Sequence, residues 1–463
     1  MKVWPFILCG LLVAGCARFQ PKPLSAAKNA ERLEERSLTN EALKTFIETN
    51  SHREFPNWPV ESWDFDTLTL AAFYYHPSLD VARAQWEVAR GGQITAAQRP
   101  NPSINATPGY DTTTSIPSPW IPLTFLDIPI ETAGKRGYRR AQAAHLAEAA
   151  RLNVADSAWQ VRSDLRSALI DVISAEQRQS LLERQVAVQQ QVVNLLQGQV
   201  QAGALAGSET VSFRIALVKA RLDLIEAQRV AAEARAHVAE AVGVPLSAID
   251  GLKLTYSGLE ALDTITQLAS AEVRRAALQS RPDILGALAE YAASQSALQL
   301  EIAKQYPDVR LEPGYQYDQG DNKWSLGIIV DLPILNQNQG PIAEAKARRN
   351  EAAARFDALQ FKVLAQIDRA SRAVQVAEKN SMALRALVDE QNKRLDSVSA
   401  QLRAGAVDQL ELLNAQFESL TAELAQLDGR LKLEQAVGTL EDAVRRPFEL
   451  PSAIFESTEA QRR

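Results

Sequence analysis

Very few residues in this chain have side chains that could carry out covalent, redox or metal chemistry. Cysteine occurs only at Cys9 and Cys16, too few for a disulfide framework or a cysteine-rich zinc site. No two histidines lie at the spacing of metal ligands, and there is no nucleophile elbow, phosphate loop or isolated carboxylate pair. We therefore expect neither an enzyme nor a resident metal or cofactor. The four histidines are His52, His76, His145 and His237.

Cys16 carries the clearest chemical expectation, because it ends a segment typical of bacterial lipoproteins. The leader starts with a positive charge, and its apolar stretch, residues 3–14, is too short to span a bilayer. Val13-Ala14-Gly15-Cys16 resembles a lipobox, in which the leader is cleaved before a cysteine that receives lipid. The alternative is an ordinary signal peptide with an incidental cysteine. Ala17 is not the aspartate that retains such lipoproteins in the inner membrane, so we expect an outer-membrane anchor.

Composition narrows the class of protein further. The chain has 463 residues, of which 46% are hydrophobic and 23% charged, which is typical of folded rather than disordered proteins. Its formal net charge of -6 argues against nucleic acid as a partner, because that interaction calls for a basic face. Beyond the leader, no apolar run reaches the ~18 residues that suggest a membrane-spanning helix.

The chain contains a long internal repeat. Four ordered motifs recur at an offset that drifts only from 205 to 202 residues. The two copies, residues 66–245 and 270–445, each predict one helix, two strands and two long helices joined by a turn. The matched motifs are His76-Pro77-Ser78-Leu79 with Arg281-Pro282-Asp283-Ile284, Pro108-Gly109-Tyr110 with Pro313-Gly314-Tyr315, Asp127-Ile128-Pro129-Ile130 with Asp331-Leu332-Pro333-Ile334, and Ala202-Gly203-Ala204 with Ala404-Gly405-Ala406.

The residues outside the two copies are assigned to four flanking segments. They are a leader (1–15), an N-terminal anchor and packing segment (16–65), a connector (246–269) and a C-terminal tail (446–463). The aromatic residues of the packing segment and its border, Trp58, Trp63 and Phe65, are expected to pack against the outside of the helical tunnel.

Long helical hairpins dominate both copies. Residues 139–200 lack proline and are rich in good helix formers, so a rise of about 1.5 Å per residue predicts a helix of roughly 90 Å. Glycine in the hairpin tips, residues 201–209 and 403–411, is typical of helix ends. The returning helix of the second copy has a heptad seam, which must be buried against its twin or another subunit. The seam residues are Leu410, Leu413, Phe417, Leu420, Leu424, Leu427 and Leu431.

Each copy also predicts a pair of strands, within residues 103–130 and 307–334. Apolar and polar side chains alternate along these runs, most clearly in the second copy. Each run has about ten residues, the length that a tilted strand needs to cross a bilayer. The expected strands are 103–111 and 120–130 in the first copy, and 309–318 and 324–332 in the second, with a turn at 319–322.

Four strands cannot close a barrel in lipid, because an open edge leaves backbone groups unpaired at a cost of several kcal/mol each. The chain must therefore share a barrel with copies of itself: two copies would give eight strands and three would give twelve. Pattern alone does not choose between them. An eight-stranded barrel is filled by its own side chains, so a conducting barrel needs at least three copies.

Together these repeated motifs resemble the TolC-like outer-membrane efflux duct family, over about residues 66–445. Residues 404–416 are especially similar to the family's periplasmic tip. The resemblance implies a mainly α fold with a small β part: duplicated long α-helical hairpins form a trimeric α-barrel, and four strands per protomer enter a shared twelve-stranded transmembrane β-barrel. Gln98-Arg99-Pro100-Asn101-Pro102 and Gly134-Lys135-Arg136 resemble the CzcC-like branch, which serves heavy-metal exporters of the resistance-nodulation-division class.

The family resemblance also implies function, location and partners. It predicts a passive, homotrimeric channel, lipid-anchored in the outer membrane, with a helical tunnel in the periplasm. The channel would receive substrates from an inner-membrane pump, favoured to be of the resistance-nodulation-division type, through a periplasmic adaptor protein. Three alternatives stay open: a coiled-coil adaptor, a structural periplasmic lipoprotein without a pore, and a duct for type I protein secretion. The exported substrate and the energy source of the pump are not predicted.

The family's gate is expected at the hairpin tips. By position after the tip glycine, its main acidic residue falls on Glu411, and its second acidic position falls on the uncharged Asn414. Asp408 could substitute for the second, and the first copy offers Glu209. Three copies of Glu411 around one axis would repel each other and attract cations. The alternative is that Glu411 and Asp408 are helix-start acids, favourable near the positive end of a helix dipole.

A basic cluster follows the strands of the first copy. Lys135, Arg136, Arg139 and Arg140 are expected either to be solvated at a helix start or to contact anionic lipid headgroups on the periplasmic side.

Overall fold

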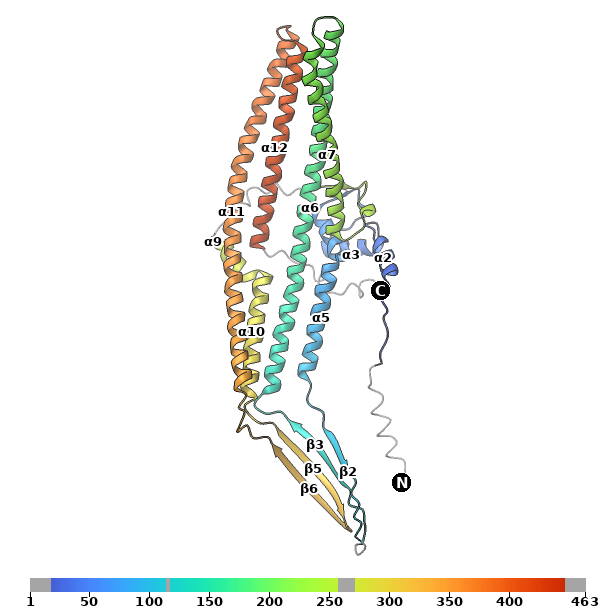
Figure 1. The fold of residues 1–463 in the computed structure, drawn as a ribbon, viewed down its shortest axis with the longest axis vertical. Helices are drawn as coiled ribbons and strands as arrows, with labels where there is room; N and C mark the ends of the chain where they lie inside the picture. The colour runs from blue at the N-terminus through green and yellow to red at the C-terminus, as the bar shows by residue number, and fades with distance from the viewer. Residues whose placement is uncertain (1–17, 114–116, 257–270, 446–463) are drawn as a thin grey trace.

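The computed structural model describes residues 18–113, 117–256 and 271–445. Its long helices run side by side, and a small sheet extends from one end (Figure 1). The predicted fold class, mainly α with duplicated long hairpins and a small β part, is confirmed. Cys16, residues 257–270 of the connector and the C-terminal tail lie outside the described residues.

Each repeat has the same order of elements. A medium helix leads into two strands, and the strands lead into a long helix that turns back at a tip into a second one. The tip of the first repeat includes the 3-10 helix η1, Gly207–Thr210. The first repeat comprises α5 (Pro77–Ala97), α6 (Lys135–Gln201) and α7 (Val211–Val242); the second comprises α10 (Pro282–Ala303), α11 (Gln339–Arg403) and α12 (Gln409–Val444).

Local sequence explains where the medium helices begin. Pro77 and Pro282 stand in the first turn of α5 and α10, where a missing N–H costs nothing and the fixed φ suits a helix. The preceding His76 caps α5 by accepting from the backbone N–H of Ser78 through Nδ1. The repeated Pro motifs are therefore helix starts.

The four long strands form one antiparallel sheet in the order β2-β3-β5-β6. The two inner strands, one from each repeat, pair with each other, so the repeats are joined through the sheet. The strands are β2 (Ser103–Thr107), β3 (Leu123–Ile130), β5 (Val309–Asp318) and β6 (Asp321–Val330).

The predicted strand edges were wrong in four places. In the first repeat the strands stop near Pro108 and start after Pro122, because proline has no N–H for the ladder. Between them the bridge Tyr110–Trp120 continues the pairing, with backbone hydrogen bonds between Gly109 and Ile121. In the second repeat the ladder reaches Asp318–Asp321, so the turn is shorter than predicted, and β6 ends at Val330 rather than 332.

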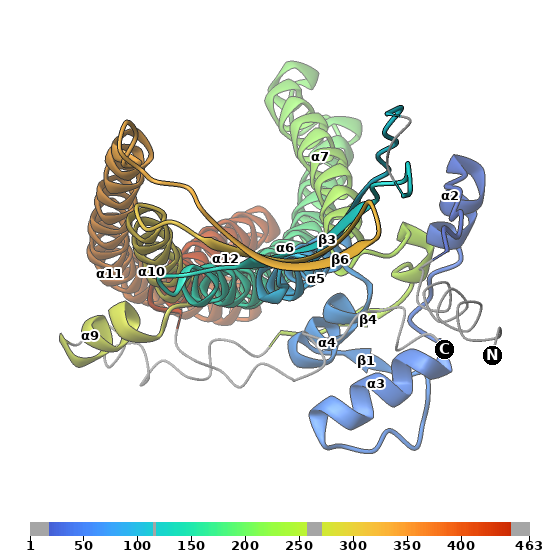
Figure 2. The same ribbon diagram turned by 90° about the horizontal axis from the view of Figure 1, so that it is seen from below.

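Seen from below, the helices form a curved wall, and α3 (Glu41–Ser51), α4 (Phe65–Tyr75) and α9 (Ala271–Ser280) lie on its convex side (Figure 2). The largest hydrophobic core joins α3 and α4 to α6 and α7. Trp63 is fully buried in it, and Trp58 and Phe65 pack against it. These aromatic residues therefore pack against the first hairpin, and their position outside a tunnel stays a prediction.

The two hairpins meet along α6 and α12, where the seam is apolar in its centre and ionic at its margins. Leu413, Leu420 and Leu427 of α12 are buried against α6. Beside them, basic side chains of α6 pair with acidic side chains of α12. The pairs are Arg162–Glu441, Arg166–Glu441, Arg166–Asp442, Arg178–Asp428 and Arg184–Glu423.

Among the described residues, no helix is both long enough and apolar enough to cross a membrane.

Candidate functional site

The tips of the two hairpins lie at the same end of the molecule, far from the sheet (Figure 1). Gly203 and Gly405 follow the long helices with φ of 69° and 73°, a left-handed conformation that glycine adopts without steric cost. The N–H groups of Gly405 and Ala406 donate to the carbonyls of Leu402 and Gln401. This is the arrangement that satisfies the last carbonyls of a helix, and it explains the Ala-Gly motif of both tips.

Asp408 acts as the N-cap of α12. Its carboxylate accepts a hydrogen bond from the backbone N–H of Glu411 at 2.9 Å. The exposed Asp408 side chain is therefore engaged in holding the start of the helix. The helix-start interpretation holds for this residue.

Glu411 has a different environment. Its Oε1 lies 3.6 Å from Nη2 of Arg394 on α11, and 44% of its side chain is exposed. Arg394 also pairs with Glu418 one to two turns further along α12. Glu411 is thus one of two carboxylates that hold Arg394 between the helices of the second hairpin.

The remaining predicted tip residues are exposed. Glu209 lies in η1 of the first tip, and Asn414 lies in the first turns of α12. The structure brings Asp408, Glu411 and Asn414 together on one helix and puts Glu209 on the neighbouring tip. Arg394 is the tip residue that sequence reasoning missed, because its pairing depends on the register of α11 against α12.

At the opposite end, the sheet has one apolar face and one polar face. Strand register puts Leu126, Ile128, Leu326 and Ile328 on the same side, and Leu326 and Ile328 are 67% and 64% exposed. Near the β5–β6 turn, Tyr315 and Trp324 pack with ring centroids 5.0 Å apart. An exposed apolar band bordered by aromatic residues is typical of strands that face lipid.

The basic cluster Lys135, Arg136, Arg139 and Arg140 lies at the junction of the sheet and the helices. Its buried member, Lys135, is neither solvated nor placed to contact lipid headgroups. Lys135 is buried, and its Nζ donates to the carbonyl of Tyr306 and to Asp308, both at 2.7 Å. Arg136 donates to the carbonyl of Ala97. The Lys135 amine is therefore not available to solvent or headgroups, whereas Arg136 is half-buried and Arg140 is exposed.

Arg139 belongs to the same junction. Its guanidinium pairs with Glu131 at 2.6 Å, and these hydrogen bonds raise the pKa of Arg139. The cluster therefore joins the strand ends to the sheet-facing ends of α5, α6 and α10. Its partners lie up to 173 residues away, which is why the sequence did not reveal the role.

Comparison with known proteins supports the predicted family resemblance. Residues 273–444 match the family model described as outer membrane efflux protein. The chain is 24% identical over 370 residues to the cobalt-zinc-cadmium resistance protein CzcC of Cupriavidus metallidurans, covering 79% of this chain and 85% of that one. The predicted resemblance to TolC-like outer-membrane efflux ducts is confirmed.

Further relatives agree with this assignment. The chain is 26% identical over 171 residues to outer membrane protein OprJ of Pseudomonas aeruginosa, covering 35% of this chain and 36% of that one. Its fold resembles the outer-membrane channel OprN, with a TM-score of 0.67, 17% identity and coverage of 93% and 98%. It also resembles VceC of Vibrio cholerae, with a TM-score of 0.66, 18% identity and coverage of 82% and 95%. The predicted function, the outer-membrane channel of a tripartite efflux system, is confirmed.

Proposed function

We propose that the efflux protein works as a homotrimer in which three chains complete one continuous duct. The observation that carries this proposal is a difference between equivalent helix positions. Leu413, Leu420 and Leu427 of α12 are at most 8% exposed because α6 covers them. At the equivalent positions of α7, 202 residues earlier, Val211, Val218 and Ile225 are 44%, 55% and 62% exposed.

The repeat identifies the missing partner of α7. Within one chain α12 packs on α6; the repeat equivalents of these two helices are α7 and α11. If α7 packs on α11 in the way that α12 packs on α6, then α7 of one copy contacts α11 of the next copy. α11 offers exposed apolar side chains for this contact, including Phe361 and Met382, which are 75% and 60% exposed. Because α7 and α11 lie at opposite ends of the curved wall (Figure 2), this contact is head-to-tail and closes into a ring.

The sheet supports the same assembly. β2 and β6 are its outer strands, and within the described residues each has one edge without a strand partner. Joining β2 of one copy to β6 of the next removes these edges. Three copies give twelve strands, which leave room for a passage, whereas two copies give a filled barrel.

Three finer assignments belong to the same proposal. Cys16 is the lipid-bearing residue of the mature chain, supported by the lipobox-like sequence before it. The partners are a periplasmic adaptor and a pump of the resistance-nodulation-division type, supported by the relation to CzcC. Glu411 and Glu209, with Asp408 and Asn414 beside them, form the periplasmic constriction. Its support is their common position at the tips.

The trimer is tested by native mass spectrometry of the detergent-extracted protein together with planar-bilayer recording. Three chains per particle and discrete conductance steps are expected. A monomer or dimer that gives no conductance steps contradicts the proposal. The lipid anchor is tested separately by metabolic labelling with palmitate, which Cys16→Ser should abolish while leaving the trimer intact.

A further inference from the structure

A row of four basic residues runs along one side of α11 at intervals of seven residues. Side chains seven apart lie nearly above one another on a helix, so the row occupies one face. The members are Arg348, Arg355, Lys362 and Arg369. At an offset of 202 residues, the first repeat has the uncharged Leu146, Asn153, Gln160 and Ser167. The row is therefore a property of the second repeat and is not needed to build the fold.

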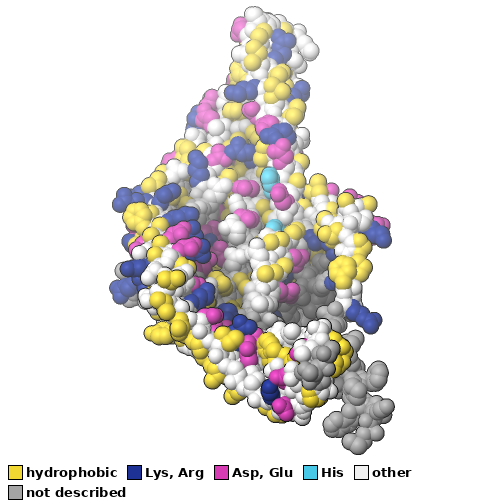
Figure 3. All heavy atoms as spheres, turned by 60° about the horizontal axis from the view of Figure 1, so that its bottom comes forward, with side chains coloured by type: hydrophobic (Ala, Val, Ile, Leu, Met, Phe, Trp, Pro, Cys, Tyr) yellow, Lys and Arg dark blue, Asp and Glu magenta, His cyan; other side chains and the backbone are white. Residues whose placement is uncertain are grey.

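The row divides into a paired half and a half without acidic partners. Arg348 and Arg355 pair with Glu344 and Glu351 one turn earlier, both at 2.5 Å. Lys362 and Arg369 make no hydrogen bond or ion pair with any residue in the described part of the chain. Figure 3 shows the basic side chains along the α11 wall, at the left beside the hollowed face.

Lys362 and Arg369 face the concave side of the wall. On α11, Ile367 and Ala370 point into the core shared with α12, and Asp368 pairs with Arg274 of α9 on the convex side. At about 100° per residue, Lys362 and Arg369 stand on a third side, about 100–120° around the helix from Asp368. In the proposed trimer this third side lines the tunnel.

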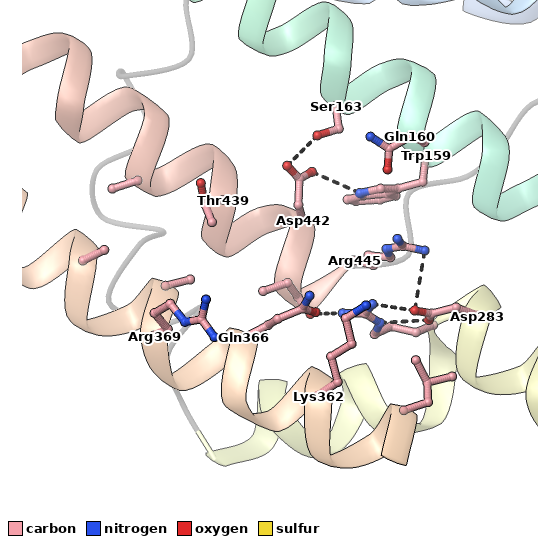
Figure 4. Close-up of a pocket in the computed structure, with 16 residues that line it drawn as sticks. Trp159, Gln160, Ser163, Asp283, Lys362, Gln366, Arg369, Thr439, Asp442 and Arg445 are labelled. Carbon is pink, nitrogen blue, oxygen red and sulfur yellow. Dashed lines mark hydrogen bonds and ion pairs between the residues drawn. The ribbon is translucent and has the colours of Figure 1, made fainter. Parts of the chain in front are cut away.

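The same residues line a cavity of about 480 Å³ between α6, α11 and the end of α12 (Figure 4). On α6, the cavity is lined by Gln160. Arg162 stacks over Phe65 on the convex side of the wall. Gln160 lies about 200° around the helix from Arg162, so it faces away from the convex side. The cavity therefore opens on the concave face. Its polar lining also includes Gln366, whereas the hydroxyls of Ser163 and Thr439 already donate to Asp442 and to the carbonyl of Gln435.

Two further arginines lie in this cavity. Arg281 is 3% exposed and is held by Asp283 and by the carbonyl of Ala443. Arg445 is mostly buried and has contacts with Asp156 and Asp283, but its Nε is buried without a hydrogen-bond partner. Burial lowers the pKa of Arg445 to about 10. The cavity thus has four basic side chains against Asp283 and Asp442, and Asp442 is engaged by Trp159, Ser163 and Arg166.

The geometry points to a binding site for multivalent oxyanions, such as a polycarboxylate or a phosphate-bearing solute, in which Lys362 and Arg369 supply the unpaired positive charge. This inference adds a specificity-determining site to the proposed function; only its position inside the duct rests on the trimer. Free cations are repelled at this level, so the site favours cargo with negative charge, including a metal held in an anionic complex. The site prefers such a solute over chloride, because the solute can form charge-assisted hydrogen bonds with two basic groups at once.

Citrate is a suitable probe. Isothermal titration calorimetry of the full detergent-extracted protein, with ionic strength held constant by NaCl, should show saturable citrate binding. Lys362→Gln with Arg369→Gln should raise the dissociation constant at least about tenfold, because two charge-assisted hydrogen bonds to the solute are lost. The matched control, Lys393→Gln with Arg403→Gln, removes the same charge from the tip end of α11 and should bind as the wild type does.

Three results would overturn the site: no citrate binding to the wild type, unchanged binding by the Lys362/Arg369 variant, or an equal loss in the control. In planar bilayers, citrate should reduce the single-channel current of the wild type and not that of the Lys362/Arg369 variant. Protein that binds citrate but forms no channels contradicts the proposed function alone. Channels that conduct but ignore citrate contradict this site alone.

Discussion

The equivalence of α7 and α12 makes a quantitative prediction about assembly. Ile225 and Leu427 hold the same heptad position in the two repeats, yet Ile225 is 62% exposed and Leu427 is 8% exposed in one chain. Full burial of such a side chain contributes about 1.5–3 kcal/mol, so covering the exposed part of Ile225 is worth about 1–2 kcal/mol per contact. Three contacts close a trimer, so Ile225→Ala should weaken it by about 3–6 kcal/mol in total.

The matched variant Leu427→Ala separates assembly from folding. It removes a side chain that is already buried within the chain, so it should lower the free energy of unfolding by about 2–4 kcal/mol. It should leave the contact between copies unchanged. Ile225→Ala should show the reverse: normal helix content by circular dichroism, and dissociation at higher protein concentration by analytical ultracentrifugation in detergent.

The reasoning fails if Ile225→Ala dissociates no more readily than the wild type on dilution. It also fails if Leu427→Ala and Ile225→Ala change assembly by the same amount, because the repeat would then not distinguish an internal seam from a contact between copies. Asp223→Ala, an exposed change on another side of α7, should have no effect on assembly.

The tips and the seam lead to three further predictions. Glu411→Ala with Glu209→Ala should raise single-channel conductance in planar bilayers. Unchanged conductance and cation selectivity would show that these residues do not form the constriction. Asp408→Ala should instead lower the free energy of unfolding by about 1 kcal/mol, because the helix cap is lost. Arg166→Met should lower the free energy of unfolding in urea by about 2 kcal/mol. This is less than the 3–5 kcal/mol lost when a fully buried ion pair is broken, because Glu441 and Asp442 are about 30% exposed and keep other partners. Burial lowers the pKa of His76 below 6.5, so its contribution to stability is present above pH 6.5 and is lost as the pH falls toward the folded-state pKa. His76→Gln should flatten this part of the profile of stability against pH. An unchanged profile would rule out His76 as the source of the pH dependence.

The features that the sequence predicted well are those set by local chemistry. Helix length followed from residue propensity, the tips from glycine, and the starts of α5 and α10 from Pro77 and Pro282. The alternation of β5 and β6 was equally visible because one face is apolar. These signals need only neighbours in sequence, so a single chain displays them.

The features it missed depend on register between distant elements. Nothing near Lys135 indicates that its amine bonds the carbonyl of Tyr306 and the carboxylate of Asp308. Glu411 and Asp408 are both acids at a helix start, yet one pairs with Arg394 and the other caps the helix. Only the packing of α11 against α12 separates their roles, and that packing is fixed by the whole seam.

The equivalent long helices α6 and α11 differ in where their basic side chains lie. The arginines of α6 at the α12 seam are all paired with acids, so they hold the two repeats of one chain together. At the corresponding positions α11 has Leu364, Asp368, Asn380 and Ala386, none of which is basic. Its basic row lies instead on the concave face. The seam within a chain is therefore ionic at its margins, whereas the proposed seam between chains relies on apolar side chains. Raising the salt concentration should consequently weaken the α6–α12 seam before it weakens the contact between copies.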